Sequence, residues 1–142
     1  MMLTRMLHPD ILSTLGRAGH GSCVLVADGN YPVSTHSPGS AAKVFLNLRP
    51  GLVQVMDVLE VLRDTIPIEQ ATMMSPPDRQ PPAIHRRLLK QLPAGVPTRN
   101  LTRTEFYAAV NQPTTALVIV TGEERRFANV LLTIGVYKNG QK

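Results

Sequence analysis

Residues 19–32 read GHGSCVLVADGNYP, and no other stretch of the chain indicates more about its fold. The apolar run Cys23–Ala27 has the length and β-branched content of a buried strand, and glycine and proline mark its ends. A strand of about five residues is only ~17 Å long, so we expect His20 and Asp28 near its opposite ends. The two side chains can share one site only if another element, or another subunit, covers the strand.

The residue types at the two ends of this strand allow two interpretations. Histidine can exchange protons near neutral pH, and a carboxylate beside a turn can accept hydrogen bonds from hydroxyl groups. On composition alone, a capping His20 and a turn residue Asp28 are the simpler interpretation. The single cysteine, Cys23, begins the apolar run and is interpreted as a small core residue rather than a nucleophile.

Length and composition indicate one globular domain. The chain has 142 residues, with 43% hydrophobic and 18% charged residues, which is enough apolar content for a packed core. One cysteine excludes an internal disulfide. Residues 1–7 lack the apolar segment of a secretory signal, and no apolar run approaches the length of a membrane span. We therefore expect a cytoplasmic protein with no membrane partner.

The basic residues of the chain do not form a nucleic-acid-binding motif. The net charge is +5, but the arginines are dispersed, and only residues 86–87 and 125–126 are adjacent pairs. Aromatic residues make up 4% of the chain and do not alternate with basic residues, as a base-stacking surface would require. Basic side chains on solvent-exposed faces of the protein explain the net charge better, so no nucleic-acid partner is predicted.

Helical and strand patterns alternate along the chain. Helical spacing of apolar residues predicts helices over residues 9–18, 52–62 and 84–92, and a capping box at Thr102 and Glu105 predicts a short helix up to Val110. Strands are predicted over residues 23–27, 68–74, 116–120 and 130–136, with a short apolar piece at 44–46. The pattern predicts a single-domain, three-layer α/β fold with a mostly parallel central sheet.

Several motifs of known chemistry are absent from the sequence. It contains no GxGxxG or Walker loop, no GxSxG nucleophile elbow and no HExxH motif, and its four histidines lack ligand spacing. Neither a cofactor nor a metal is predicted. Polar groups at strand ends and in loops suit a small, hydroxyl-rich ligand.

The order and spacing of several short motifs resemble the D-ribose pyranase/L-fucose mutarotase family of bacterial sugar-handling proteins. The matching motifs are HPDIL at 8–12, GHG at 19–21, DGNYP at 28–32, TGE at 121–123, and ANVLL at 128–132 followed by Gly135-Val136. Arg103 with Phe106-Tyr107, and the TGE motif, are closer to the fucose branch. The resemblance implies a cofactor-independent isomerase of carbohydrate metabolism that interconverts the anomers of fucose or a related monosaccharide.

The resemblance also implies roles for individual residues. His20, Asp28 and Arg103 would be catalytic: His20 transfers protons, Asp28 holds sugar hydroxyls or orients the imidazole, and Arg103 donates to ring or hydroxyl oxygens. The residues implied in substrate binding are Asn129, Phe127, Tyr107 and Met74. Four of these residues have a structural alternative: a solvated helix start for Arg103, a strand cap for Asn129, and packing for Tyr107 and Met74.

One position departs from the family pattern. The residue two before the signature Asn129 is usually a tyrosine that faces the sugar, and here it is Phe127. A phenyl ring can stack under a sugar face but cannot donate a hydrogen bond. A non-catalytic sugar-binding or transport-associated protein of the same fold is the competing interpretation.

The family also implies an assembly, a closed ring that is usually a decamer of two stacked pentamers with the pocket between neighbouring subunits. The loops at 29–42 and 75–82 are long and rich in proline for so small a domain. We expect these loops to pack against a neighbouring subunit, which would bury apolar residues such as Tyr31 and Val33.

Overall fold

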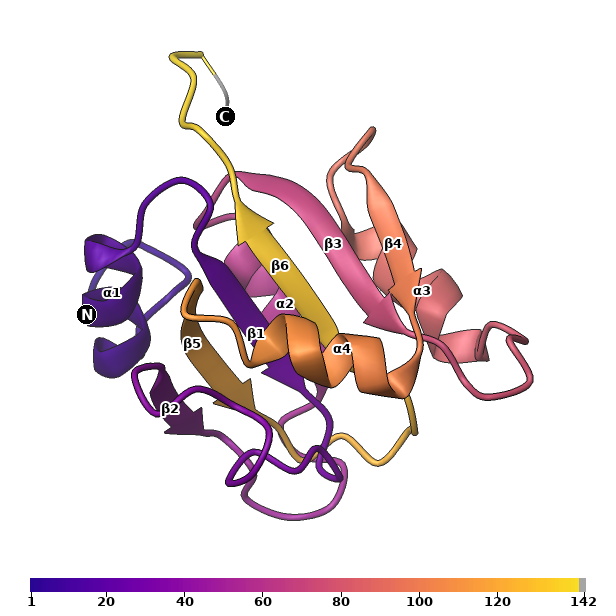
Figure 1. Cartoon of the computed structure of the whole chain (residues 1–142). Helices are drawn as coiled ribbons and strands as arrows, with labels where there is room; N and C mark the ends of the chain where they lie inside the picture. Colours follow the sequence, from indigo (N-terminus) through magenta and orange to yellow (C-terminus); the bar gives the residue numbers. More distant parts are fainter. Residues whose placement is uncertain (141–142) are drawn as a thin grey trace.

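Six strands form one sheet in the order β2-β5-β1-β6-β3-β4 (Figure 1). The computed structural model describes residues 1–140. The strands are β1 (Cys23–Ala27), β2 (Ala42–Phe45), β3 (Ile68–Met74), β4 (Thr98–Leu101), β5 (Thr115–Val120) and β6 (Val130–Ile134). Every neighbouring pair is parallel except those of β6, which runs antiparallel to β1 and β3. Five strands therefore end at the same edge of the sheet, and β6 begins there.

Helices cover both faces of the sheet, so the predicted three-layer α/β architecture is confirmed. The helices are α1 (Pro9–Arg17), α2 (Val55–Arg63), α3 (Ala83–Gln91) and α4 (Arg103–Val110). The larger apolar core contains buried residues of α1, α2 and α3, whereas the second core contains those of α4. Figure 1 shows α4 crossing the near face of the sheet and α2 lying behind it. No helix within residues 1–140 combines the length and apolar character needed to cross a bilayer.

Helix α4 begins where the sequence predicts. Thr102 Oγ1 accepts a hydrogen bond from the Glu105 backbone N–H, and the Glu105 carboxylate accepts one from the Thr102 backbone N–H at 2.9 Å. This reciprocal cap satisfies two backbone donors that the first helical turn leaves without partners. Phe106 and Val110, one turn apart, are fully buried in the second core. The cap and this apolar stripe together fix Arg103 in the first turn of the helix, at the strand-end edge of the sheet.

Strand β4 is absent from the sequence-based prediction, which otherwise identifies the main elements. Its residues, Thr-Arg-Asn-Leu, are mostly exposed at the edge of the sheet, so the strand lacks the apolar alternation that would reveal it. The predicted helix over 52–62 begins only at Val55, because residues 46–53 turn back over Gly122 instead. A Cβ on Gly122 would lie 2.4 Å from the Arg49 carbonyl oxygen, so this close approach requires glycine.

The loop after β1 packs against its own chain, contrary to the expectation that it needs a neighbour. Tyr31 and Val33 are both buried in the second core, together with Phe106. The Tyr31 and Phe106 rings pack edge to face, with centroids 6.3 Å apart. Helix α4 thus provides the apolar partner that the isolated loop sequence lacks, and these two residues give no support for an oligomer.

Candidate functional site

A pocket of about 310 Å³ opens at the edge where the parallel strands end. It is lined by Asp28, Asn30, Tyr31, Met74, Arg103, Tyr107, Arg126, Phe127 and Asn129. These residues come from the ends of β1 and β3, the start of α4 and the segment that leads into β6. Crevices at the carboxyl ends of parallel strands are common ligand sites, because loops from several strands converge there. The structure thus brings together six of the seven predicted site residues, all except His20.

Asp28 and Asn129 form the polar floor of this pocket. Asn129 Nδ2 donates to Asp28 Oδ2 at 3.0 Å, and Asn129 Oδ1 accepts from the Asp28 backbone N–H at 2.8 Å. The Asn30 backbone N–H donates to Asp28 Oδ1 at 3.0 Å. Burial raises the pKa of the Asp28 carboxyl above its ordinary value, although these hydrogen bonds oppose the shift. The carboxylate is therefore held in a fixed orientation with its remaining lone pairs available to a ligand.

Aromatic side chains form one wall of the pocket. The Tyr31 and Tyr107 rings meet edge to face with centroids 5.5 Å apart, and the His36 ring lies 4.3 Å from that of Tyr107. The Tyr31 hydroxyl donates to the His36 carbonyl oxygen at 2.9 Å, and burial raises the Tyr31 pKa, so this hydroxyl remains protonated. Such contacts make the wall rigid and apolar, which suits stacking against the carbon face of a sugar.

Phe127 also lines the pocket and has an unusual backbone. Its φ angle is +62°, in the left-handed region that costs a residue with a Cβ roughly 1–2 kcal/mol. His85 of α3 donates from Nε2 to the Phe127 carbonyl oxygen at 2.9 Å. Burial lowers the His85 pKa, which keeps this imidazole neutral. The hydrogen bond thus stabilises a backbone conformation that aims the ring into the pocket.

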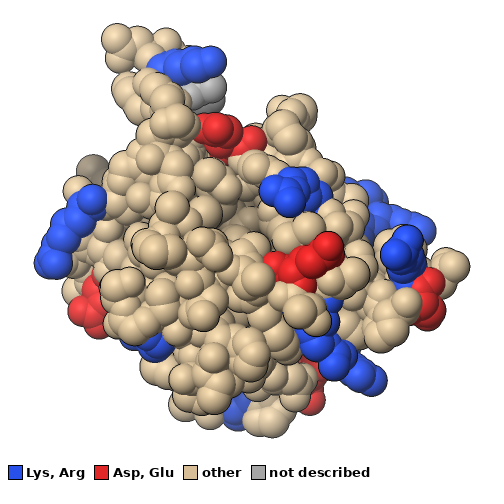
Figure 2. All heavy atoms as spheres, in the orientation of Figure 1, with Lys and Arg blue, Asp and Glu red and all other residues tan. Residues whose placement is uncertain are grey.

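Two arginines stand at the rim of the pocket. Arg103 and Arg126 are both exposed, and neither forms an ion pair with a carboxylate of residues 1–140. The Arg126 Cζ lies 5.7 Å from the centroid of the Phe127 ring, a cation–π distance. Figure 2 shows further basic side chains on the side of this face where α3 and β4 lie. The rim therefore offers several hydrogen-bond donors to a ligand with many oxygen atoms.

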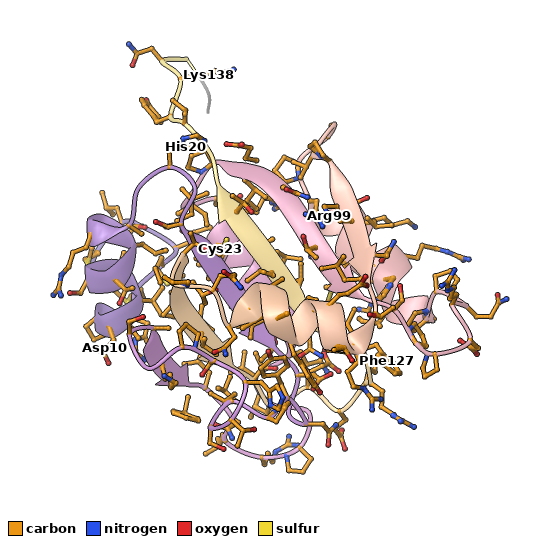
Figure 3. The ribbon with its side chains drawn as sticks, in the orientation of Figure 1. Asp10, His20, Cys23, Arg99, Phe127 and Lys138 are labelled. Carbon is orange, nitrogen blue, oxygen red and sulfur yellow. The ribbon has the colours of Figure 1, made fainter. Side chains whose placement is uncertain are left out.

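His20 lies outside the pocket, at the opposite end of β1 (Figure 3). Its side chain is 57% exposed, and its Nε2 is 2.7 Å from Glu69 Oε2. This placement agrees with the expectation from the sequence that His20 and Asp28 lie at opposite ends of the strand. No element within residues 1–140 brings His20 to the pocket that Asp28 lines.

Four residues of the site or its support are missing from the sequence-based prediction. Asn30 and Tyr31 lie within the DGNYP motif, and Arg126 directly precedes Phe127, so proximity to predicted residues is the signal for all three. His85 has no such signal, because its contact with Phe127 joins residues 42 positions apart in the sequence.

A second hollow of about 520 Å³ lies beside the first and shares Asn30 with it. Its buried acid, Glu123, is bound by both Nε and Nη2 of Arg125 at 2.7 and 2.6 Å. Burial alone would raise the pKa of Glu123, but the hydrogen bonds from Arg125 lower it below its ordinary value. This carboxylate therefore belongs to a structural ion pair. Within residues 1–140, no group of three or more His, Cys, Asp or Glu side chains is arranged to hold a metal ion.

Comparisons with known proteins agree with this fold. A D-ribose pyranase of Variovorax paradoxus (strain S110) is 30% identical over 141 residues, covering 96% of this chain and 98% of the relative. The structure of Bacillus subtilis RbsD complexed with D-ribose superposes with a TM-score of 0.81 at 24% identity, covering 97% and 100% of the two chains. The fucose mutarotase of Streptococcus pneumoniae in complex with L-fucose gives a TM-score of 0.78 at 21% identity, covering 97% and 100%. The sequence profile of the RbsD / FucU transport protein family matches residues 1–137, and the chain belongs to that family.

Proposed function

We propose that this protein is a cofactor-independent sugar mutarotase, an isomerase that interconverts the anomers of a reducing monosaccharide. The observation that carries the proposal is the Asp28–Asn129 pair on the floor of a pocket with aromatic walls and an arginine at its rim. This combination orients hydroxyl groups, supports a sugar ring and donates to its oxygens. The D-ribose pyranase relative supports the same activity class.

The reaction opens and closes the sugar ring, and the only chemistry it requires from the protein is proton transfer. A base removes the proton of the anomeric hydroxyl while an acid protonates the ring oxygen, and the bond between the anomeric carbon and the ring oxygen breaks. The carbonyl carbon then rotates, and the ring closes on its other face. We assign both proton transfers to His20, whose imidazole accepts the proton of the anomeric hydroxyl and delivers a proton to the ring oxygen. Asp28 and Asn129 bind hydroxyl groups, and Arg103, which stays charged, donates a hydrogen bond toward the ring oxygen.

The proposed site is shared between subunits of a ring, with a decamer as the expected assembly. His20 and Asp28 are separated by the length of β1, so a neighbouring subunit would supply His20 to the pocket of the next chain. Exposed apolar side chains support an oligomer: Phe45, Leu48, Val136 and Tyr137 are 62%, 79%, 54% and 70% exposed. They lie in two separate segments, one at the end of β2 and one after β6, and apolar side chains such as these are common where subunits meet.

The proposed substrate is L-fucose or a related deoxy sugar. Met74 and Phe127 give the pocket an apolar part, next to the aromatic wall of Tyr31 and Tyr107. A methyl group, such as that at C6 of fucose, would be desolvated there at a gain of about 0.8 kcal/mol. L-Galactose, which carries a hydroxyl in place of one hydrogen of that methyl group, would leave a polar group without a partner. D-Ribose is the second candidate, because the curated relative is a D-ribose pyranase.

Saturation-transfer NMR of anomer exchange tests this proposal, with L-fucose, L-galactose and D-ribose measured with and without protein. Because sugars mutarotate in water unaided, catalysis is the exchange rate in excess of that background. We expect the largest excess for L-fucose and a smaller one for L-galactose. Line broadening of the sugar signals with no excess exchange would instead identify a non-catalytic sugar-binding or transport-associated protein.

A further inference from the structure

We propose that Glu69 is a positioning residue that orients the imidazole of His20 for proton transfer. This inference rests on the proposed function of His20 as the proton carrier. Nothing in the sequence motifs indicates Glu69, which lies near the start of β3, 49 positions from His20. Three structural observations converge on it.

The first observation is the contact itself. Glu69 Oε2 lies 2.7 Å from His20 Nε2, a short distance typical of a charge-assisted hydrogen bond. Both side chains are more than half exposed, 57% for His20 and 52% for Glu69. Exposed pairs of this kind contribute about 0–1 kcal/mol to folding, so stability does not account for the arrangement.

The second observation is a β-bulge at Glu69. In the pairing of β3 with β6, Ile68 lies opposite Ile134 and Gln70 lies opposite Thr133, so Glu69 is the extra residue. A bulge interrupts the ladder and re-aims the side chain of the residue it inserts. Without the bulge, the direction of the side chain at position 69 would follow the regular alternation of side chains between the two faces of the sheet.

The third observation is a glycine packed against the bulge. A Cβ on Gly135 would lie 3.1 Å from the Glu69 Cβ and 3.5 Å from its backbone nitrogen. Gly135 follows β6 and donates its N–H to the Pro67 carbonyl oxygen at 2.8 Å. The absence of a side chain there therefore leaves room for Glu69 beside the end of β6.

The chemical consequence concerns the two imidazole nitrogens. A carboxylate accepts hydrogen bonds only, so its contact with Nε2 favours the tautomer with the proton on Nε2 and a lone pair on Nδ1. Nδ1 is then the atom that accepts the proton of a sugar hydroxyl, and the carboxylate stabilises the imidazolium that forms. Glu69 acts through His20 and does not contact the sugar, as an orienting acid does in catalytic triads.

The test combines a spectroscopic readout with kinetics. In protein labelled with 15N-histidine, at a pH where the imidazole is neutral, the His20 signals (assigned by their loss in His20→Ala) should show the Nε2–H tautomer. Glu69→Ala should give a mixture of tautomers and lower the excess anomer-exchange rate at saturating sugar by at least about tenfold. Glu69→Gln, which keeps an acceptor oxygen, should retain the tautomer and recover part of the rate. Glu124→Ala, an exposed carboxylate outside the smaller pocket, is the matched control and should match the wild type.

A double-mutant cycle separates this role from a general structural effect. In a His20→Ala background, Glu69→Ala should cause no further loss of exchange, because the residue through which it acts is gone. An unchanged tautomer and an unchanged rate in Glu69→Ala would overturn the positioning role. If wild-type protein gives no excess exchange with any sugar, the proposed function fails, while the tautomer measurement still tests whether Glu69 orients His20.

Discussion

Asn129 is hydrogen-bonded to both the backbone and the side chain of Asp28. Its Oδ1 accepts from the Asp28 N–H at 2.8 Å, and its Nδ2 donates to Asp28 Oδ2 at 3.0 Å. Asn129 immediately precedes β6, and Asp28 immediately follows β1, which is paired antiparallel to β6. The two side chains therefore adopt a fixed relative orientation before any ligand arrives.

Replacing Asn129 with alanine should remove this fixed orientation. The buried Asp28 N–H and one carboxylate oxygen lose their partner, which we expect to destabilise the fold by about 1–3 kcal/mol. The excess exchange rate should fall at least about tenfold, because Asp28 no longer presents its lone pairs in one direction. Denaturant unfolding and saturation-transfer NMR measure the two effects, and Asn139→Ala, an exposed amide, is the control. Full activity in Asn129→Ala would show that the pair is structural only.

Replacing His20 with alanine should lower anomer exchange while leaving the fold intact. Removal of one positioned acid–base group typically costs on the order of 10²–10⁴ in rate. His20 is more than half exposed, so the thermal transition should change little. Excess exchange equal to that of the wild type would contradict a proton-transfer role for His20.

Phe127→Tyr should raise activity or widen the range of sugars accepted. The ring already lines the pocket, and the added hydroxyl would supply the donor that the family usually has at this position. Exchange rates across the sugar panel measure the change. A neutral or lower rate would indicate that the pocket is built around the phenyl ring and suits a different ligand.

The buried His85 should make stability depend on pH. Burial lowers its folded-state pKa below the ordinary value of 6.5, so the unfolded chain binds the proton more readily. The contribution of neutral His85 is therefore fully present above pH 6.5 and is lost as the pH falls from 6.5 toward the lower folded pKa. His85→Gln should show a smaller loss of thermal stability over that interval than the wild type. Parallel curves for the two proteins would exclude His85 as the source of the dependence.

The sequence predicts the residues at strand ends better than the contacts between distant elements. Asp28 directly follows β1, Met74 ends β3 and Asn129 directly precedes β6, and all three strands are predicted, so the convergence of strand ends brings these residues together. Arg103 is predictable because the capping box fixes the start of α4.

Glu69 and His85 could not be predicted in the same way. The position of Glu69 depends on the register between β3 and β6, and a bulge has no signal in the sequence of one strand. His85 lies on a helical stripe with Ile84 and Leu88, so the sequence pattern indicates that it is buried. The pattern does not identify the carbonyl group that it contacts. Strand β4 was not predicted for a related reason. An exposed edge strand needs no alternation of apolar and polar residues, so its sequence carries no strand signal.

Mixed oligomers of His20→Ala and Asp28→Ala test the shared site most directly. The two variants, each inactive alone, would carry different affinity tags and be co-expressed, and the doubly tagged oligomers would be isolated. If each site takes His20 from one subunit and Asp28 from its neighbour, random assembly gives about a quarter of the sites both residues. We therefore expect saturation-transfer NMR to show about a quarter of the wild-type excess exchange. Mixed oligomers as inactive as the separate variants, or a fully active wild-type monomer by light scattering, would contradict a site shared between subunits.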